Sequence, residues 1–252
     1  MTTLITVESL GLPTTKSEIN KNYSAQKFLM LGASKIGKTE FWAQDDTNFF
    51  IRTERGHNHV QNLGMDCTDW NDVEKVIGKL TQASAIKPFP YLTIIVDTGD
   101  RLLDFANEHV VQIAQERYKS REINGIGEIP EGVGWFMLKQ LMNNFLGKFE
   151  KLPCAKAMIF HLTTDEREDE SGKKYKIDTI NLGGKTGKAM MAWYDHIMHI
   201  KSQFVGEQLA RTIICKPSKT VEAGSRGQML PEKIQWTNDS KANWIKFRAF
   251  FN

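Results

Sequence analysis

The strongest constraint on this chain is the segment GASKIGKT, which runs from Gly32 to Thr39. An apolar run, FLML, comes directly before it, and the helix-like EFWA comes directly after it. In a strand–loop–helix unit of this kind, the glycines let backbone N–H groups surround phosphate oxygens. The lysine then contacts the terminal phosphates and the threonine binds Mg²⁺. The segment is therefore a P-loop by sequence, and it predicts an α/β fold that binds ATP and Mg²⁺. The predicted nucleotide contacts are Gly32, Ala33, Ser34, Lys35, Ile36, Gly37, Lys38, Thr39 and Glu40.

The length and composition fit one large α/β domain or two small ones, since 252 residues with 40% hydrophobic content can bury a substantial core. No break in composition argues for two domains. Residues 1–25 are polar and read as an N-terminal extension, either a loosely packed arm or a subunit-contact arm, and 26–252 read as the ATPase domain.

The charge balance is mild, because 33 basic and 30 acidic residues give a net charge of +3. Any prediction of nucleic-acid binding must therefore rest on local clusters. Three widely spaced cysteines without a CxxC pair indicate neither a zinc site nor a disulfide framework, which fits a reducing cytoplasm. The sequence has no apolar run of 18 residues, so we expect no membrane partner.

Two further apolar runs end on acids, FFIRTE at Glu54 and YLTIIVD at Asp97. In open α/β sheets the carboxyl ends of the strands border the ligand site, so Glu54 is a candidate general base; the alternative is a solvent-exposed strand-end acid. Asp97 would hold Mg²⁺ through water and Thr39. Because Asp97 is not followed by a second acid, the role of the base stays open for Glu54.

Histidines end or occupy two other predicted strands. His161 follows the run AKAMIF, where a polar residue can sense the γ-phosphate, although a lone histidine is more often simply hydrogen-bonded. His196 and His199 have the spacing of helical metal ligands, but they stand on a predicted strand, so we do not assign them to a metal.

Two segments have the composition of mobile nucleic-acid-binding loops. Residues 117–134 are rich in glycine and carry cations, and the acidic turn 165–170 is followed by 171–188, in which glycine, lysine and one tyrosine alternate. Single-stranded DNA needs charge neutralisation and a stacking face, which such a segment supplies; an ordinary lysine-bearing β-hairpin is the alternative for 171–188. The candidate DNA-binding residues are Lys119, Arg121, Lys173, Lys174, Lys176, Lys185 and Lys188.

Taken in order, these motifs together with RTIICKPSK (211–219) resemble the RecA-like ATPase core over about residues 27–236. More narrowly, they resemble phage-encoded single-domain nucleotide-binding proteins related to single-strand annealing recombinases. The resemblance implies a mostly parallel central sheet flanked by helices, with antiparallel C-terminal strands. It also implies that Glu54 polarises the attacking water, that Asp97 serves Mg²⁺ and that His161 is the polar sensor.

The resemblance implies further that 117–134 and 165–188 face DNA, and that Lys216 and Lys219 reach the nucleotide of a neighbouring subunit. Arg226 follows a Gly-Ser turn, so we expect these three cations together at the nucleotide edge of the sheet. The sequence thus predicts an ATPase that assembles head-to-tail, as a ring or filament, on single-stranded DNA.

Its predicted role is recombination or single-strand annealing in the cytoplasm of a bacterial host, with a single-strand DNA-binding protein as a further partner. One alternative is a helicase or helicase loader with the same core, and another is a non-hydrolysing scaffold gated by nucleotide.

Overall fold

The computed structural model describes residues 7–54, 59–119, 121–180 and 184–251, except for the side chains of 8, 184–186, 188, 205 and 208. Its main helices and strands are β1 (Lys27–Gly32), α1 (Lys38–Trp42), β2 (Phe49–Arg52), β3 (Leu63–Asp66), α2 (Trp70–Ala83), β4 (Thr93–Asp97), α3 (Gly99–Arg117), α4 (Val133–Glu150), β5 (Ala155–His161), β6 (Thr163–Glu168), β7 (Lys174–Thr179), α5 (Gly184–Trp193), β8 (His196–Val205), β9 (Gln208–Ile214), β10 (Gly224–Ser225), β11 (Lys233–Trp236) and α6 (Ser240–Arg248).

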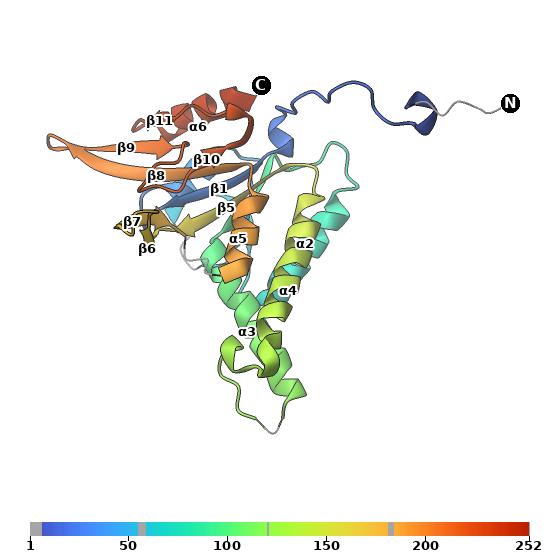
Figure 1. Ribbon diagram of the computed structural model, residues 1–252. Coiled ribbons are helices and arrows are strands. Elements are labelled where there is room, and N and C mark those ends of the chain that lie inside the picture. Colours follow the sequence, from blue (N-terminus) through green and yellow to red (C-terminus); the bar gives the residue numbers. More distant parts are fainter. Residues whose placement is uncertain (1–6, 55–58, 120, 181–183, 252) are drawn as a thin grey trace.

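Within these described ranges, one nine-stranded sheet forms the centre, in the order β11-β9-β8-β1-β5-β4-β2-β3, with β10 beside β8. The pairs from β8 across to β3 are all parallel, whereas β9, β10 and β11 pair antiparallel. Figure 1 shows α2, α3, α4 and α5 on one face of the sheet and α6 on the other. The prediction of a mostly parallel α/β sheet with antiparallel C-terminal strands is confirmed.

The P-loop strand β1 is buried on both faces because it stands between two parallel neighbours. Leu29 and Leu31 belong to the apolar core under α2, α3 and α4, whereas Phe28 and Met30 belong to the core under α1 and α6. Strand side chains alternate between faces, so a run such as FLML buries apolar surface on both sides at once.

An aromatic cluster closes the α1 and α6 face. Phe41 and Trp42 of α1 pack against Trp244 and Phe247 of α6, with ring centroids between 5.2 and 5.9 Å apart. Tyr23 packs edge-on against the same two α6 rings, so the packed part of the chain begins within the predicted extension. Residues 9–22 are exposed, and Figure 1 shows this stretch running away from the body of the molecule.

The structure corrects the prediction for 165–188, which is not an acidic turn followed by a lysine loop. β6 and β7 form a two-stranded antiparallel hairpin, in which Glu166 lies opposite Lys176 and Glu168 opposite Lys174. Acidic and basic side chains that face each other across an antiparallel pair stabilise it, which explains the ordered strands. The glycine and lysine stretch after the hairpin enters α5. The structure therefore has the lysine-bearing hairpin that the sequence left as an alternative.

Candidate functional site

The loop after β1 holds its lysine in a buried position. Lys38 Nζ donates hydrogen bonds to the carbonyl oxygens of Gly32 and Ala33, both at 2.8 Å, and Lys38 is 6% exposed. Burial lowers the pKa of this ammonium, whereas the carboxylates of Asp97, Asp100 and Glu54 act in the opposite direction. The loop therefore presents one cation among three acids at the carboxyl edge of the parallel strands, which we call the carboxyl edge below.

The hydroxyl of Thr39 and the carboxylate of Asp97 lie together, as the sequence predicts. Thr39 Oγ1 donates a hydrogen bond of 2.7 Å to Asp97 Oδ2, and Asp97 is 4% exposed at the end of β4. Mg²⁺ prefers oxygen ligands and is commonly held by one or two protein groups together with phosphate oxygens and water. This pair has the donor chemistry of such a site.

Glu54 lies at the same edge, two residues beyond β2, and its carboxylate is held by a neighbouring strand end. Thr98 Oγ1 donates a hydrogen bond of 2.8 Å to Glu54 Oε1. The side chain of Glu54 is 41% exposed, and its Oε1 lies 3.7 Å from Nδ1 of His161. The geometry therefore leaves the carboxylate open to water while its direction is fixed.

The sequence prediction missed Asp100, which completes this group. Asp100 Oδ2 accepts a hydrogen bond from the backbone N–H of His161 at 2.7 Å and lies 3.3 Å from His161 Nδ1. Burial raises the pKa of the Asp100 carboxyl, and the nearby charge of Glu54 acts in the same direction. His161 thus stands between two carboxylates. The spacing VDTGD was the available signal, since it puts a second acid in the first turn of the helix that follows β4.

Gly99 makes this approach feasible. A side-chain carbon built on Gly99 would lie 2.2 Å from Cζ of Phe160 in β5. Only a residue without Cβ lets the start of α3, and with it Asp100, come this close to the end of β5. The register agrees, because Gly32 pairs with His161 and Arg52 with Asp97, so all the groups of the site share one edge.

Comparison with protein families agrees with this arrangement. A family model described as an AAA domain matches residues 24–227. The chain belongs to the AAA domain family. A search of curated proteins finds no match. Membership of this family supports a P-loop NTPase fold for the chain and, in general terms, the binding of nucleotide with Mg²⁺. The match spans the P-loop and the whole group from Glu54 to His161. The described part of the chain contains no helix that is long and apolar enough to cross a membrane.

Lys216, the first of the three C-terminal cations, does not lie at the predicted nucleotide edge of the sheet, because β9 runs antiparallel to β8. Ile214, at the end of β9, pairs with His199, whereas the next residue of β8, Ile200, is the one level with Gly32 of the P-loop. Lys216 follows the end of β9 and therefore lies toward the opposite edge of the sheet. An antiparallel strand brings its beginning, not its end, to the carboxyl edge.

The other two cations are engaged in ion pairs, and they do not lie together. Lys219 Nζ lies 2.9 Å from Asp169 Oδ2, at the turn of the β6–β7 hairpin. Arg226 Nη1 lies 3.0 Å from Asp195 Oδ1, and the backbone N–H of Asp195 bonds to the carbonyl oxygen of Lys27 at the start of β1. The prediction that Lys216, Lys219 and Arg226 gather at the nucleotide edge is therefore wrong.

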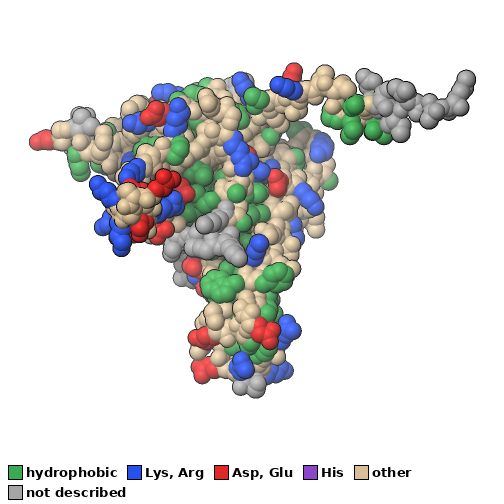
Figure 2. Space-filling model, in the orientation of Figure 1, with side chains coloured by type: hydrophobic (Ala, Val, Ile, Leu, Met, Phe, Trp, Pro, Cys, Tyr) green, Lys and Arg blue, Asp and Glu red, His purple; other side chains and the backbone are tan. Residues whose placement is uncertain are grey.

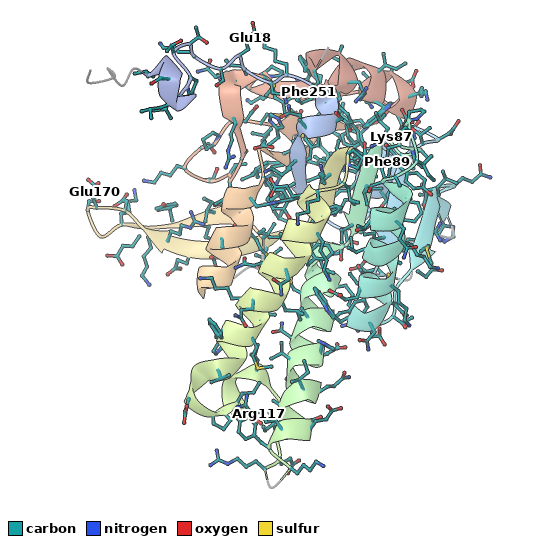
Figure 3. All side chains as sticks on the ribbon, turned by 90° about the vertical axis from the view of Figure 1, so that its right-hand side faces the viewer. Glu18, Lys87, Phe89, Arg117, Glu170 and Phe251 are labelled. Atoms are coloured by element: carbon teal, nitrogen blue, oxygen red, sulfur yellow. The ribbon has the colours of Figure 1, made fainter. Side chains whose placement is uncertain are left out.

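Five of the seven predicted DNA-binding cations lie on two projections. Figure 3 shows Glu170 at the end of the β6–β7 hairpin and Arg117 at the end of α3, both extending away from the sheet. Lys119 and Arg121 are exposed beside Arg117, in the connection to α4. Among the hairpin cations, Lys174 pairs with Glu166 at 2.8 Å, and Figure 2 shows acidic and basic side chains mixed on this surface.

Two of the predicted DNA contacts, Lys185 and Lys188, belong to α5, but their side chains lie outside the described residues. Lys173 and Lys176 are exposed on the hairpin. Contact of these residues with DNA stays a prediction.

Proposed function

We propose that this protein binds ATP with Mg²⁺ at the P-loop and hydrolyses it, with Glu54 as the general base. The observation that carries the proposal is the position of Glu54, whose carboxylate is fixed by Thr98 and shares one edge with Lys38 and the Thr39–Asp97 pair. In this reading, Mg²⁺ bound at Thr39 and Asp97 supplies charge neutralisation for the phosphates.

Three residues of the site, Lys38, Glu54 and His161, each have a definite task in this mechanism. Lys38 is held among loop carbonyls and supplies positive charge where the terminal phosphates bind. Glu54 accepts the proton of the attacking water, which reaches it because the side chain is 41% exposed. His161, between Glu54 and Asp100, is a positioning residue that keeps the two carboxylates apart and oriented.

The test compares Glu54→Gln with the wild type in two measurements, ATP affinity and the steady-state rate of phosphate release. The variant keeps the shape of the side chain but cannot take up a proton, so it should bind ATP normally and hydrolyse it on the order of 10² to 10⁴ times more slowly. Glu116→Gln, an exposed acid on α3, is the matched control. Hydrolysis by Glu54→Gln at the wild-type rate would place the base elsewhere.

We infer that single-stranded DNA is the partner of this ATPase and that it acts in recombination or annealing, as its resemblance to RecA-like recombinases implies. Support comes from exposed cations on the two projections and from Tyr175, a half-buried ring among the hairpin lysines that Lys219 Nζ overlies at 5.2 Å from the ring centroid. The ATPase rate should rise when single-stranded DNA is added. Neutralising the hairpin lysines should also make DNA binding less dependent on salt. The slope of log binding constant against log salt concentration should become shallower by roughly 0.7 for each phosphate contact that is lost.

Two outcomes separate this role from its alternatives, and a third tests the contribution of the hairpin. A helicase would separate a forked duplex, whereas the proposed protein would not. A nucleotide-gated scaffold would bind ATP but turn it over no faster with DNA than without it. A wild-type salt slope after the lysines are neutralised would remove the hairpin from the DNA-binding surface.

Head-to-tail assembly of copies of this chain into a ring or filament is the remaining part of the proposal, and a single-strand DNA-binding protein is a further proposed partner. Lys216 is exposed and lies toward the edge opposite its own P-loop. We propose that in a head-to-tail assembly this edge meets the P-loop of the next subunit, so that Lys216 acts across the interface and not within one subunit.

A further inference from the structure

Three side chains converge on Gly37, the P-loop residue before the lysine. A carbon built at the Cβ position of Gly37 would lie 3.5 Å from Cζ2 of Trp236, 3.6 Å from Nη1 of Arg211 and 3.9 Å from Oε2 of Glu40. Gly37 has a φ of 103°, in the left-handed region that favours glycine, so the loop bends here and brings its backbone against these groups. Arg211 and Trp236 therefore form a wall beside the P-loop, built from β9 and β11.

The architecture of the sheet fixes this wall. Arg211 lies directly opposite Trp236 in the antiparallel pair of β9 and β11, and opposite Ser202 in the pair of β9 and β8. Trp236 is 8% exposed, and its ring packs against Phe41 of α1 with ring centroids 5.4 Å apart. A buried ring next to a half-buried arginine restricts where the guanidinium can go, because the two cross-strand side chains share one face of the sheet.

Arg211 is the one arginine of β9, and its charge is unpaired among the described residues. Across the residues that the structure describes, its guanidinium takes part in no ion pair and no hydrogen bond. The carboxylate of Glu40, which also lies near Gly37, accepts a hydrogen bond of 2.7 Å at its Oε1 from Ser240 Oγ. An arginine held against a phosphate-binding loop with all five donors free is equipped to bind an anion.

We propose that Arg211 binds the phosphate chain of the nucleotide in the P-loop of its own subunit. This inference rests on the proposed function, and it adds a second cation to Lys38 that comes from the same chain and not from a neighbour. Guanidinium donors suit phosphate oxygens because they can form two parallel charge-assisted hydrogen bonds. Trp236 acts as a positioning residue for the arginine.

The experiment measures the dissociation constant of ADP with Mg²⁺ for the wild type, Arg211→Met and Arg211→Lys. Methionine keeps much of the stem that packs beside Trp236 and removes the charge, so Arg211→Met should bind ADP about 10 to 100 times more weakly, the loss expected for one charge-assisted contact. Arg211→Lys should recover part of this loss. Lys233→Ala, an exposed cation on β11, is the matched control and should bind ADP like the wild type.

Two further measurements make the result specific. Melting temperatures without nucleotide should agree among the wild type and the variants, so that weaker binding is not caused by unfolding. Adenosine, which lacks phosphate, should bind the wild type and Arg211→Met equally. An unchanged ADP affinity in Arg211→Met would overturn the inference, and so would an equal loss for ADP and adenosine, because that pattern indicates contact with the base or ribose.

Lys38→Ala, measured in parallel, separates this inference from the proposed function. If Lys38→Ala binds ADP like the wild type, the P-loop assignment itself is wrong. If Lys38→Ala loses ADP while Arg211→Met keeps it, only the role of Arg211 is refuted.

Discussion

Acid should destabilise this protein through two histidines buried in β8, the strand next to the P-loop strand. His196 and His199 are both 0% exposed. The ring of His196 is hydrogen-bonded to Ser225 and Gln26, whereas neither ring nitrogen of His199 has a hydrogen-bond partner among the described residues. Burial lowers the pKa of both rings from 6.5 to about 4, and the nearby charges of Arg226 for His196 and Lys201 for His199 act in the same direction.

The sign of the effect follows from where the protons bind. Below pH 6.5 the unfolded chain takes up a proton on each histidine, but the folded protein does so only near pH 4, so the free energy of unfolding falls as the pH falls between these values. Between pH 7 and pH 5 each histidine accounts for a loss of about 2 kcal/mol. Together they remove about 4 kcal/mol, a large part of the ~5–15 kcal/mol that stabilises a typical domain.

Urea unfolding at pH 7 and pH 5 measures this loss in the wild type and in His199→Leu. Leucine fills a similar volume, cannot be protonated and leaves no polar atom unpaired, so the variant should lose about 2 kcal/mol less than the wild type over this range. His59→Leu changes an exposed histidine and should behave like the wild type. If His199→Leu and the wild type lose the same free energy, burial of His199 does not control its protonation, and the reasoning is refuted.

Three other changes test the site and the assembly. Gly99→Ala should destabilise the fold by about 1–3 kcal/mol in urea unfolding, because the new methyl group would clash with the ring of Phe160 in β5. Gly78→Ala is the control: Gly78 faces open space in α2, so the change should stabilise the fold by up to about 1 kcal/mol. Asp97→Asn should lower the ATPase rate and remove its Mg²⁺ dependence, which a Mg²⁺ titration measures; an unchanged titration curve would place the metal elsewhere. If Lys216 acts across an interface, mixing Lys216→Ala subunits with Glu54→Gln subunits should restore part of the ATPase activity. If assemblies of normal size form and their activity stays at the level of the separate variants, this role is excluded.

Much of the site could be predicted because its residues belong to local patterns. The P-loop is continuous in sequence, and Asp97 and Glu54 each end an apolar strand, so a parallel sheet brings them to one edge. Asp100 was missed because its contribution depends on how closely α3 approaches β5, a distance that Gly99 sets and that no local pattern reveals.

The wrong prediction for Lys216 has a different cause. Lys216 was assigned to the nucleotide edge because it follows a strand, but the direction of β9 relative to β8 decides which end of that strand reaches the edge. Strand direction depends on the hydrogen-bonding partner, and the side-chain pattern of a buried strand is similar in either direction. Arg211, at the fourth residue of β9, was overlooked for the same reason.

The position of β1 in the sheet has a consequence for how the protein is made. This strand lies near the beginning of the chain, but its two hydrogen-bonding neighbours, β5 and β8, comprise residues 155–161 and 196–205. At typical rates of synthesis the ribosome needs roughly 10 s to reach the first of them. During that time FLML has both backbone edges unpaired, which is the condition under which chaperones bind nascent chains and incomplete chains aggregate. Translation that stops before residue 155 should therefore yield a fragment that carries an intact P-loop sequence and has no strand to hold it in place.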